Sequence, residues 1–320
     1  MNAADVDDGG ARVHLPVMVD EVVDVFRPVP EGVIVDATVG AGGHSAAILA
    51  ARPDLSVIGL DRDEDALTEA ATATAPFGAR ATLVHARFDT LADAVRDLGH
   101  ERVSGVLFDL GVSSMQLDRP DRGFSYRGDG PLDMRMDRTQ PFSAADVVNE
   151  YRFEPLAELI ARFGGERFAA RIARAIVDAR PLATTGQLAE VVRDAIPAPA
   201  RRRGGHPARR TFQAIRIEVN AELAVLPRAL DQALDLLVPG GRAAVLAYHS
   251  GEDRLVKAKF VFAETGGCVC PPGLPCVCGA VPDVRLLWRG VHKPAAAEVA
   301  ANRRAESARL RAVEKLRRSA

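Results

Sequence analysis

The sequence predicts an α/β protein whose core is a doubly wound, parallel sheet interrupted by a helical insert. Short apolar runs alternate with stretches of helical periodicity, as in sheets that helices cover on both faces. The spacing breaks once, because about 130 residues separate Leu110 from Arg242, whereas one strand–helix–strand crossover needs roughly 30. The apolar runs, each a predicted strand, are residues 33–37, 56–61, 81–84, 103–110, 242–248 and 284–288.

The first apolar run leads into a glycine-rich loop. Gly40, Gly42 and Gly43 precede His44 and a helical stretch. A buried strand, small residues and a helix together bring backbone N–H groups close to a nucleotide-like ligand, because side chains would block the approach. Asp61 ends the second run, where a doubly wound fold places a carboxylate that binds a ribose. The pattern predicts an adenosine-containing cofactor.

The spacing of the glycines indicates which cofactor this is. A dinucleotide fingerprint has the pattern G-x-G-x-x-G, and Ser45 occupies the position of its third glycine. This departure disfavours a nicotinamide-dependent oxidoreductase. A strand that ends in an acid, here Asp36, followed by a short glycine loop and Asp61, instead fits S-adenosylmethionine (SAM), whose amino acid end is small and zwitterionic. Asp36 taken alone is also typical of a helix cap.

Composition limits the class of protein. The chain has 320 residues, 48% of them hydrophobic, and a formal net charge of −2. It can therefore form a sizeable core, and any contact with nucleic acid must come from local basic patches. No apolar stretch reaches the roughly 18 residues of a membrane span, and residues 1–14 lack the apolar centre of a secretion signal. We expect a cytoplasmic protein without a membrane partner, and composition leaves monomer and homodimer open.

Four segments are predicted along the chain. Residues 1–110 form the first part of the core, residues 111–206 an inserted loop and helical domain, residues 207–295 the second part of the core, and residues 296–320 a basic tail. The insert begins with residues 111–141, which are rich in Gly, Asp, Arg and Pro and show no periodicity. A long irregular segment in a compact protein is more often functional than idle.

Helical spacing returns after this segment. An amphipathic helix is predicted over residues 155–180, with Ile172 and Ile176 on its apolar face. Thr184 and Gln187 form a capping box for a further helix.

A helix is also predicted after the insert, with Phe212 and Ile215 on its buried stripe. A polar face such as its other side is usually only solvated. That side carries Arg209, Gln213, Arg216 and Asn220. A run of arginines nearby favours phosphate binding, because the planar guanidinium fork matches phosphate oxygens. The run comprises Arg201, Arg202, Arg203, Arg209 and Arg210. Residues 302–320 hold seven Arg or Lys against two Glu and are predicted to form a second basic arm.

The only four cysteines of the chain lie within residues 268–278. They are Cys268, Cys270, Cys276 and Cys278, spaced as two C-x-C pairs. In a reducing compartment such a cluster argues against disulfides and favours a metal. Structural zinc sites more often use C-x2-C, so a loop constrained by Pro and Gly remains the alternative. No metal ligand is assigned from the sequence.

Eight motifs resemble the MraW family of bacterial ribosomal RNA small subunit methyltransferases. Their occurrence in order from about His14 to Arg311 makes the resemblance specific. The motifs are HLPVMVDE at 14–21, DATVGAGGHS at 36–45, GLDRDEDAL at 59–67, FDLGVSSMQLD at 108–118, DRGFSYRGDGPLDMRMD at 121–137, GGERFAARIARAIV at 164–177, RTFQAIRIEVNAEL at 210–223 and YHSGEDRLVK at 248–257.

The resemblance implies a Rossmann-like SAM-dependent methyltransferase core with an inserted, mostly helical domain. It implies an enzyme that methylates the N4 amino group of a specific cytidine in the decoding centre of 16S rRNA, with the small ribosomal subunit as partner. A non-catalytic SAM-binding ribosome assembly factor is the alternative. The implied cofactor contacts are Gly42, Gly43, His44, Asp61, Phe88, Asp109 and Gln116.

No residue is assigned as the catalyst. The lone pair of a cytosine N4 amine is delocalised into the ring, so the enzyme must supply an acceptor for the amino hydrogens and position the methyl donor. Asp109 ends the fourth apolar run and is the best-placed carboxylate, although the resemblance favours a cofactor contact for it. Three polar residues could orient the base, but such residues are more often turn caps. They are Ser113, Ser114 and Asn149.

Two further groups of residues carry side chains suited to chemistry. A target base in folded RNA should be extruded and stacked on an apolar side chain, for which Phe124 and Tyr126, near Arg122 and Arg127, are candidates. We expect this loop and the helical insert to face the RNA. A Ser/His/acid hydrolase is suggested by the run from His249 to Asp253, but the sequence has no G-x-S-x-G elbow there.

Overall fold

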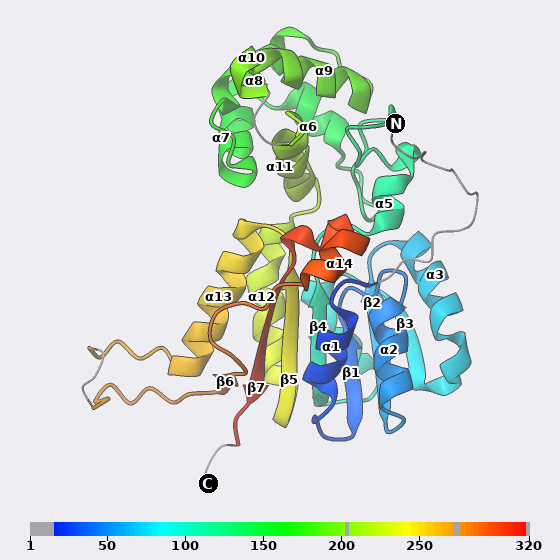
Figure 1. Ribbon diagram of the computed structural model, residues 1–320, viewed down its shortest axis with the longest axis vertical. Coiled ribbons are helices and arrows are strands. Elements are labelled where there is room, and N and C mark those ends of the chain that lie inside the picture. The colour runs from blue at the N-terminus through cyan, green and yellow to red at the C-terminus, as the bar shows by residue number, and fades with distance from the viewer. Residues whose placement is uncertain (1–15, 202–204, 272–274, 318–320) are drawn as a thin grey trace.

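The structure is a computed structural model that describes residues 16–201, 205–271 and 275–317. A sheet covered by helices forms one part, and a helical insert lies beyond one edge of that sheet (Figure 1). The strand order is β3-β2-β1-β4-β5-β7-β6, with β1 to β5 parallel and β7 antiparallel to both β5 and β6. The predicted doubly wound α/β fold is confirmed. The strands are β1 (Gly32–Asp36), β2 (Leu55–Asp61), β3 (Ala81–His85), β4 (Val103–Asp109), β5 (Leu237–Ala247), β6 (Val284–Leu286) and β7 (Arg309–Lys315).

Side chains alternate across the sheet and build a separate core on each face. Val33 and Val35 belong to a core shared with α4, α12 and α13, whereas Ile34 belongs to the opposite core, shared with α1 and α2. The helices of this part are α1 (Val19–Phe26), α2 (Gly43–Ala51), α3 (Glu64–Thr74), α4 (Leu91–Asp97), α12 (Glu222–Leu236), α13 (Ser250–Thr265) and α14 (Ala296–Ala301). Short 3-10 turns are η1 (Ala75–Arg80), η2 (Phe88–Thr90), η3 (Pro120–Arg122) and η4 (Arg303–Ser307).

Each predicted apolar run is a strand, but β7 was not predicted. Residues 302–320 were interpreted as a basic arm, and this is wrong for Arg309–Lys315, a strand whose residues 309–314 pair antiparallel with β5. Residues 318–320 lie outside the described residues. Leu310 and Ala312 are buried, while Arg309 and Arg311 form ion pairs with Asp253 of α13. Charged side chains that alternate with apolar ones on a sheet strand therefore resemble a solvated basic tail when only composition is considered.

The insert has a third core of its own. Its helices are α5 (Ser114–Asp118), α6 (Ala144–Glu150), α7 (Phe153–Gly164), α8 (Ala169–Asp178), α9 (Thr185–Ala195), α10 (Ala198–Arg201) and α11 (Arg209–Val219). The predicted capping box of α9 is present. The single helix predicted over residues 155–180 is wrong, because Gly165 takes a left-handed conformation (φ 59°) that ends α7, and α8 starts afresh at Ala169.

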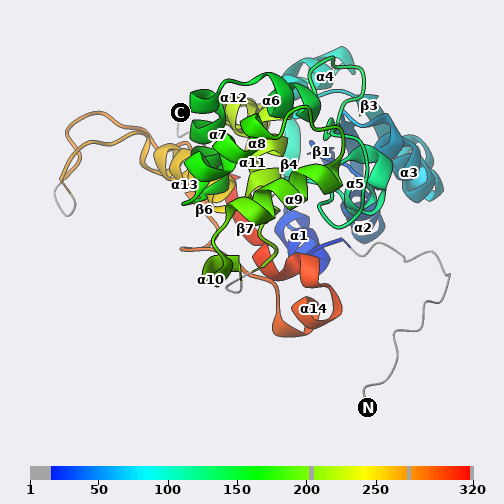
Figure 2. The same cartoon turned by 90° about the horizontal axis from the view of Figure 1, so that it is seen from above.

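Helix α11 packs as part of the insert. Phe212 and Ile215 join the insert's core beside residues of α7 and α8, although the boundary predicted from the sequence lies before this helix, at residue 206. Seen from above, the insert lies over the strand ends, and the loop after α13 extends sideways from the body (Figure 2). Among the described residues, no helix combines the length and apolarity that crossing a membrane requires.

Candidate cofactor-binding site

Three neighbouring strands end in carboxylates at the edge of the sheet that faces the insert. Asp36, Asp61 and Asp109 are the last residues of β1, β2 and β4. The strand order reverses between β1 and β4, which is the topological switch point. Ligands of doubly wound sheets bind in the crevice at that point, outside the carboxyl ends of the strands. The fold therefore places the predicted cofactor residues where a nucleotide ligand is expected.

A hydrogen bond joins the glycine loop to the Asp61 carboxylate. The Gly40 N–H donates to Asp61 Oδ2 at 2.9 Å, and the Asp63 N–H donates to Oδ1 at 2.9 Å. Burial raises the pKa of Asp61 above its ordinary value, against the lowering effect of these two donors. Gly40 has φ +53°, and a Cβ there would meet nothing closer than Thr38 O at 3.9 Å. The open side of Gly40 is a cradle that a side chain would fill, which fits a ligand approaching the backbone.

Gly42 and Gly43 lack side chains for a packing reason. A Cβ on Gly42 would lie 3.0 Å from Ala70 Cα of α3, and one on Gly43 would lie 3.1 Å from Pro16 Cγ. Both glycines thus allow the start of α2 to pack closely against its neighbours. The structure brings them to the loop beside Asp61, and their contact with the cofactor stays a prediction.

Ser45 explains why the third glycine of a dinucleotide loop is missing. Its hydroxyl donates to Asp36 Oδ2 at 2.6 Å, and the Thr38 N–H donates to Asp36 Oδ1 at 3.3 Å. Burial raises the pKa of Asp36 to about 6, although these donors and the nearby His44 lower it. Asp36 is 1% exposed, so its buried carboxylate stabilises the loop conformation through these two hydrogen bonds.

His44 and Tyr248 lie on either side of the Asp109 carboxylate. His44 Nε2 donates to Val17 O at 2.9 Å, and its Nδ1 lies 3.7 Å from Asp109 Oδ2. The Tyr248 hydroxyl donates to Asp109 Oδ1 at 2.8 Å. Burial and the charge of Asp109 raise the pKa of Tyr248 well above its ordinary value, which keeps this donor protonated. The Asp109 side chain is 27% exposed, so this fixed acceptor is partly accessible at the carboxyl edge of the sheet.

The last two predicted cofactor residues are held by neighbours. Gln116 is buried, and its Nε2 donates to Asp63 Oδ2 at 2.7 Å while its Oε1 accepts from the Ser113 N–H. Phe88 follows β3 and packs edge-on against Phe108, with ring centroids 6.0 Å apart. Gln116 is therefore linked to Asp61 by hydrogen bonds through Asp63. Phe88 packs against the core of the sheet.

The whole chain matches a known family. The model of the MraW methylase family matches residues 11–316. The chain belongs to the MraW methylase family. A relative from Symbiobacterium thermophilum is 53% identical over 309 residues, covering 95% of this chain and 96% of that protein. One from Saccharopolyspora erythraea is 52% identical over 319 residues, covering 97% and 96%. Both relatives carry the name ribosomal RNA small subunit methyltransferase H.

This methylase uses SAM as its methyl donor, as the glycine loop predicted. The bound cofactor would supply an electrophilic methyl group beside the crevice. The chain's own contribution is a set of backbone N–H groups and carboxylates held at the strand ends by the hydrogen bonds described above. Such preorganised polar groups position reactants without reorganising during the reaction.

Two residues of the loop predicted to face RNA are buried instead. Arg122 is 1% exposed and forms a buried ion pair with Asp63, with Nη2 at 2.8 Å from Oδ2. Phe124 is buried in the core of the insert under the Arg122 guanidinium. The interpretation of Phe124 as a stacking platform is therefore wrong. Tyr126 is half-buried and already stacks on His206, with centroids 4.4 Å apart.

The polar side of α11 is not a uniformly solvated face. Arg216 pairs with Glu222, with Nε at 2.8 Å from Oε1. Asn220 is buried, accepts from the Met136 N–H at 2.9 Å and donates to Met134 O at 2.7 Å. The prediction of a solvated side is thus wrong for Arg216 and Asn220. Of the arginines predicted to bind phosphate, Arg209 and Arg210 are exposed at the start of the helix, and Arg202 and Arg203 lie outside the described residues.

The other polar candidates of the methylase serve as caps and clamps. Ser113 Oγ accepts from the Gln116 N–H at the start of α5, and Asn149 bonds both backbone groups of Leu182. Ser114 is buried. His249 Nδ1 accepts from the Gly251 N–H at 3.1 Å and caps α13. His249 Nε2 lies 3.2 Å from Glu252 Oε1, so both ring nitrogens face groups at the start of α13, in agreement with the exclusion of a hydrolase drawn from the sequence.

Proposed function

We propose that this methylase transfers the SAM methyl group to the N4 amino group of a specific cytidine in the decoding centre of 16S rRNA, within the small ribosomal subunit. The observation that carries the proposal is the partly exposed Asp109 carboxylate, fixed by Tyr248 at the switch point. Full-length relatives about half identical to this chain and named as small subunit methyltransferases support the substrate class. A cytoplasmic location follows from that substrate.

The chemistry of the amine suits this site. An N4 amine becomes nucleophilic when a fixed acceptor takes a hydrogen bond from its hydrogens and localises the nitrogen lone pair. Asp109 Oδ1 accepts from Tyr248, and the carboxylate remains partly exposed. We expect Asp61 and the glycine loop to bind the cofactor, with Gly42, Gly43, His44, Phe88 and Gln116 bordering it. We expect Asp109 to contact the cofactor and to orient the amine.

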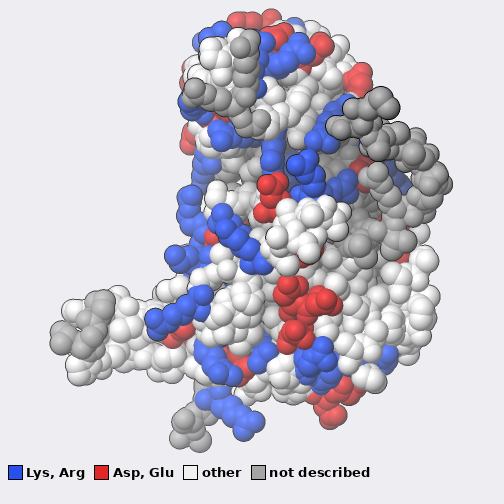
Figure 3. All heavy atoms as spheres, viewed as in Figure 1, with Lys and Arg blue, Asp and Glu red and all other residues white. Residues whose placement is uncertain are grey.

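We propose that the insert forms the RNA-facing wall. It lies over the carboxyl ends of the strands, and Lys and Arg side chains gather along the face where it meets the sheet (Figure 3). Arg127, Arg209 and Arg210 are exposed on insert elements. Arginines at such positions bind phosphates in a manner that weakens with salt. Because the net charge of the chain is only −2, contact with RNA requires a local basic patch of this kind.

The substrate is tested by methylating small ribosomal subunits from cells that lack the enzyme. Incubation with isotope-labelled SAM, followed by nucleoside mass spectrometry, is expected to yield labelled N4-methylcytidine at one position. Naked 16S rRNA in a parallel reaction shows which form of the RNA is methylated. Label on another atom or base would contradict the proposal. Failure of a single-turnover reaction with SAM-loaded protein would favour the non-catalytic assembly factor.

Tyr248→Phe is expected to slow methyl transfer at saturating SAM about tenfold, which corresponds to about 1.4 kcal/mol. The substitution removes the hydroxyl that fixes the Asp109 carboxylate. Tyr151→Phe is the matched control, because the Tyr151 hydroxyl donates to Glu218 of the insert and not to a carboxylate at a strand end. The rate is measured in single turnover and the SAM Kd by calorimetry. A raised Kd with an unchanged rate would assign Asp109 to the cofactor alone.

A further inference from the structure

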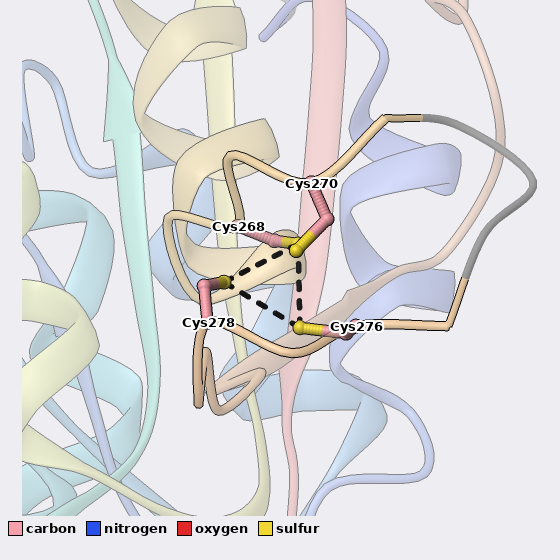
Figure 4. Close-up of side chains that lie close together, drawn as sticks. All are labelled: Cys268, Cys270, Cys276 and Cys278. Carbon is pink, nitrogen blue, oxygen red and sulfur yellow. Dashed lines mark hydrogen bonds between the residues drawn. The ribbon is translucent and has the colours of Figure 1, made fainter.

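The four cysteines converge at the side of the molecule, in the loop between α13 and β6 (Figure 4). Helix α13 starts at the carboxyl edge and runs along the sheet, so this loop leaves the body far from the SAM site (Figure 1). The Sγ atoms of Cys268 and Cys276 are 3.5 Å apart, those of Cys276 and Cys278 are 3.5 Å apart, and those of Cys278 and Cys268 are 3.7 Å apart. The Cys270 Sγ lies within 4.8 Å of the other three.

These separations match the edges of a metal–thiolate tetrahedron. With Zn–S bonds of about 2.3 Å, neighbouring sulfurs of a tetrahedral site lie about 3.8 Å apart. A disulfide would instead bring two sulfurs to about 2.05 Å. Thiols are weak hydrogen-bond donors and acceptors, so contacts between them give little energy to hold four side chains together. The arrangement has the geometry of four ligands around a common centre.

The described residues of the loop, 266–271 and 275–283, include no buried apolar side chain that could order it. Val269 and Val277, which alternate with the cysteines, are 85% and 89% exposed. The base of the loop is held by the fold: the Asp283 N–H donates to Ala263 O, and a Cβ on Gly266 would lie 2.4 Å from the Val281 backbone. Ordering the backbone costs about 1 to 2 kcal/mol per residue. A metal that binds only the ordered loop offsets this cost.

One backbone group already bonds a sulfur. The Val277 N–H donates to Cys270 Sγ at 3.4 Å. Donors to sulfur stabilise the thiolate form, which is the form that binds metals, and they orient the ligand. The described residues hold one other possible cluster, formed by Glu222, His249 and Glu252. There Arg216 already neutralises Glu222, so that cluster needs no metal.

We propose that Cys268, Cys270, Cys276 and Cys278 bind one zinc ion as a structural tetrathiolate site. Four protein ligands complete the tetrahedron and leave no open position, which is typical of structural and not catalytic zinc. Soft thiolates in tetrahedral geometry select zinc over harder cations. Binding converts four thiols into four thiolates and releases their protons to solvent. The site stiffens the loop, and SAM binding does not depend on it.

The test measures metal in the full-length protein, purified under reducing conditions without chelator. Elemental analysis is expected to give one zinc per chain. The Cys276→Ser/Cys278→Ser variant is expected to retain less than about a tenth of that zinc, because two thiolates cannot complete the site. Val269→Ser, in the same loop, leaves every thiol in place and should keep one zinc. Calorimetric SAM binding should be the same in all three proteins, which also shows that they are folded.

Cobalt substitution tests the ligand set without mutation. Co²⁺ in place of zinc is expected to show the intense visible bands of tetrahedral geometry together with sulfur-to-cobalt charge transfer. Titration of wild-type protein with a mercurial thiol reagent should release zinc in step with thiol modification. Metal-free wild-type protein, iron in place of zinc, zinc content unchanged in the double cysteine variant, or disulfide-linked pairs found by alkylation and mass spectrometry would each overturn the proposal.

Discussion

Asp61→Asn is expected to weaken SAM binding by about 10- to 100-fold, because hydrogen bonds to a charged group contribute about 1.5 to 3 kcal/mol. The Asp61 carboxylate ends β2 and is predicted to accept from the ribose hydroxyls. It also accepts from the backbone N–H groups of Gly40 and Asp63, one on each oxygen. Asparagine has a single acceptor oxygen, so its amide nitrogen must face one of these donors. The variant therefore loses the charge and disturbs the glycine loop together.

The control for this variant is a substitution just before the start of β2, the strand that Asp61 ends. Asp54 is exposed, precedes β2 and pairs with Arg52. Asp54→Asn should leave the Kd for SAM unchanged, since the carboxyl ends of the strands are untouched. Calorimetry with SAM and with S-adenosylhomocysteine measures both variants. An unaltered Kd in Asp61→Asn would show that the adenosine binds elsewhere.

Acid should also weaken SAM binding through Asp61. Burial raises the pKa of this carboxyl, so on acidification it protonates at a higher pH than an exposed aspartate. A protonated carboxyl accepts poorly from a diol, and SAM affinity should fall as the pH decreases through that raised pKa. By linkage the cofactor favours the ionised form and lowers the pKa in the complex. The fall in affinity should be shallower in Asp61→Asn, measured by calorimetry over the same pH range.

The sheet could be predicted because its strands are short apolar runs that alternate with helical periodicity. Strand β7 could not, because Arg309 and Arg311 on it resemble a solvated tail until Asp253 of α13 is known to lie beside them. The break between α7 and α8 depends on a single left-handed residue, Gly165. Periodicity within one segment reports the face that is buried, and it does not report which distant segment neutralises a charge.

In the candidate site, too, local patterns could be predicted and contacts between distant segments could not. The glycine loop and the strand-end carboxylates are local patterns, and the fold brings them together. Tyr248 was overlooked, although it directly follows β5, the neighbour of β4, and this position predicts a side chain near Asp109. The loop that contains Arg122 was expected to face RNA, whereas the Arg122 side chain is buried. Its partner Asp63 is 59 residues away, and no pattern in the sequence links the two.

Arg122→Met is expected to destabilise the protein by about 3 to 5 kcal/mol, because it leaves a buried carboxylate without its counter-charge. Arg122 and Asp63 are 1% and 3% exposed and are joined by two hydrogen bonds of 2.8 and 3.2 Å. Arg122 also donates to the carbonyl groups of Arg135 and Met136. Methionine fills a similar volume but supplies no donor. Urea unfolding followed by circular dichroism measures the loss.

Arg138→Met is the matched control in the same loop. Arg138 pairs with Asp121 at 3.0 Å, but both side chains are about half exposed or more, and such surface pairs contribute about 0 to 1 kcal/mol. Adding Asp63→Asn to Arg122→Met removes the uncompensated charge and should recover part of the stability.

Because Asp63 follows β2 and Arg122 belongs to the insert, the pair joins the sheet and the insert. Arg122→Met should therefore also speed hydrogen exchange in residues 114–137. Equal effects of the Arg122 and Arg138 substitutions would mean that the buried pair contributes no more than a surface one.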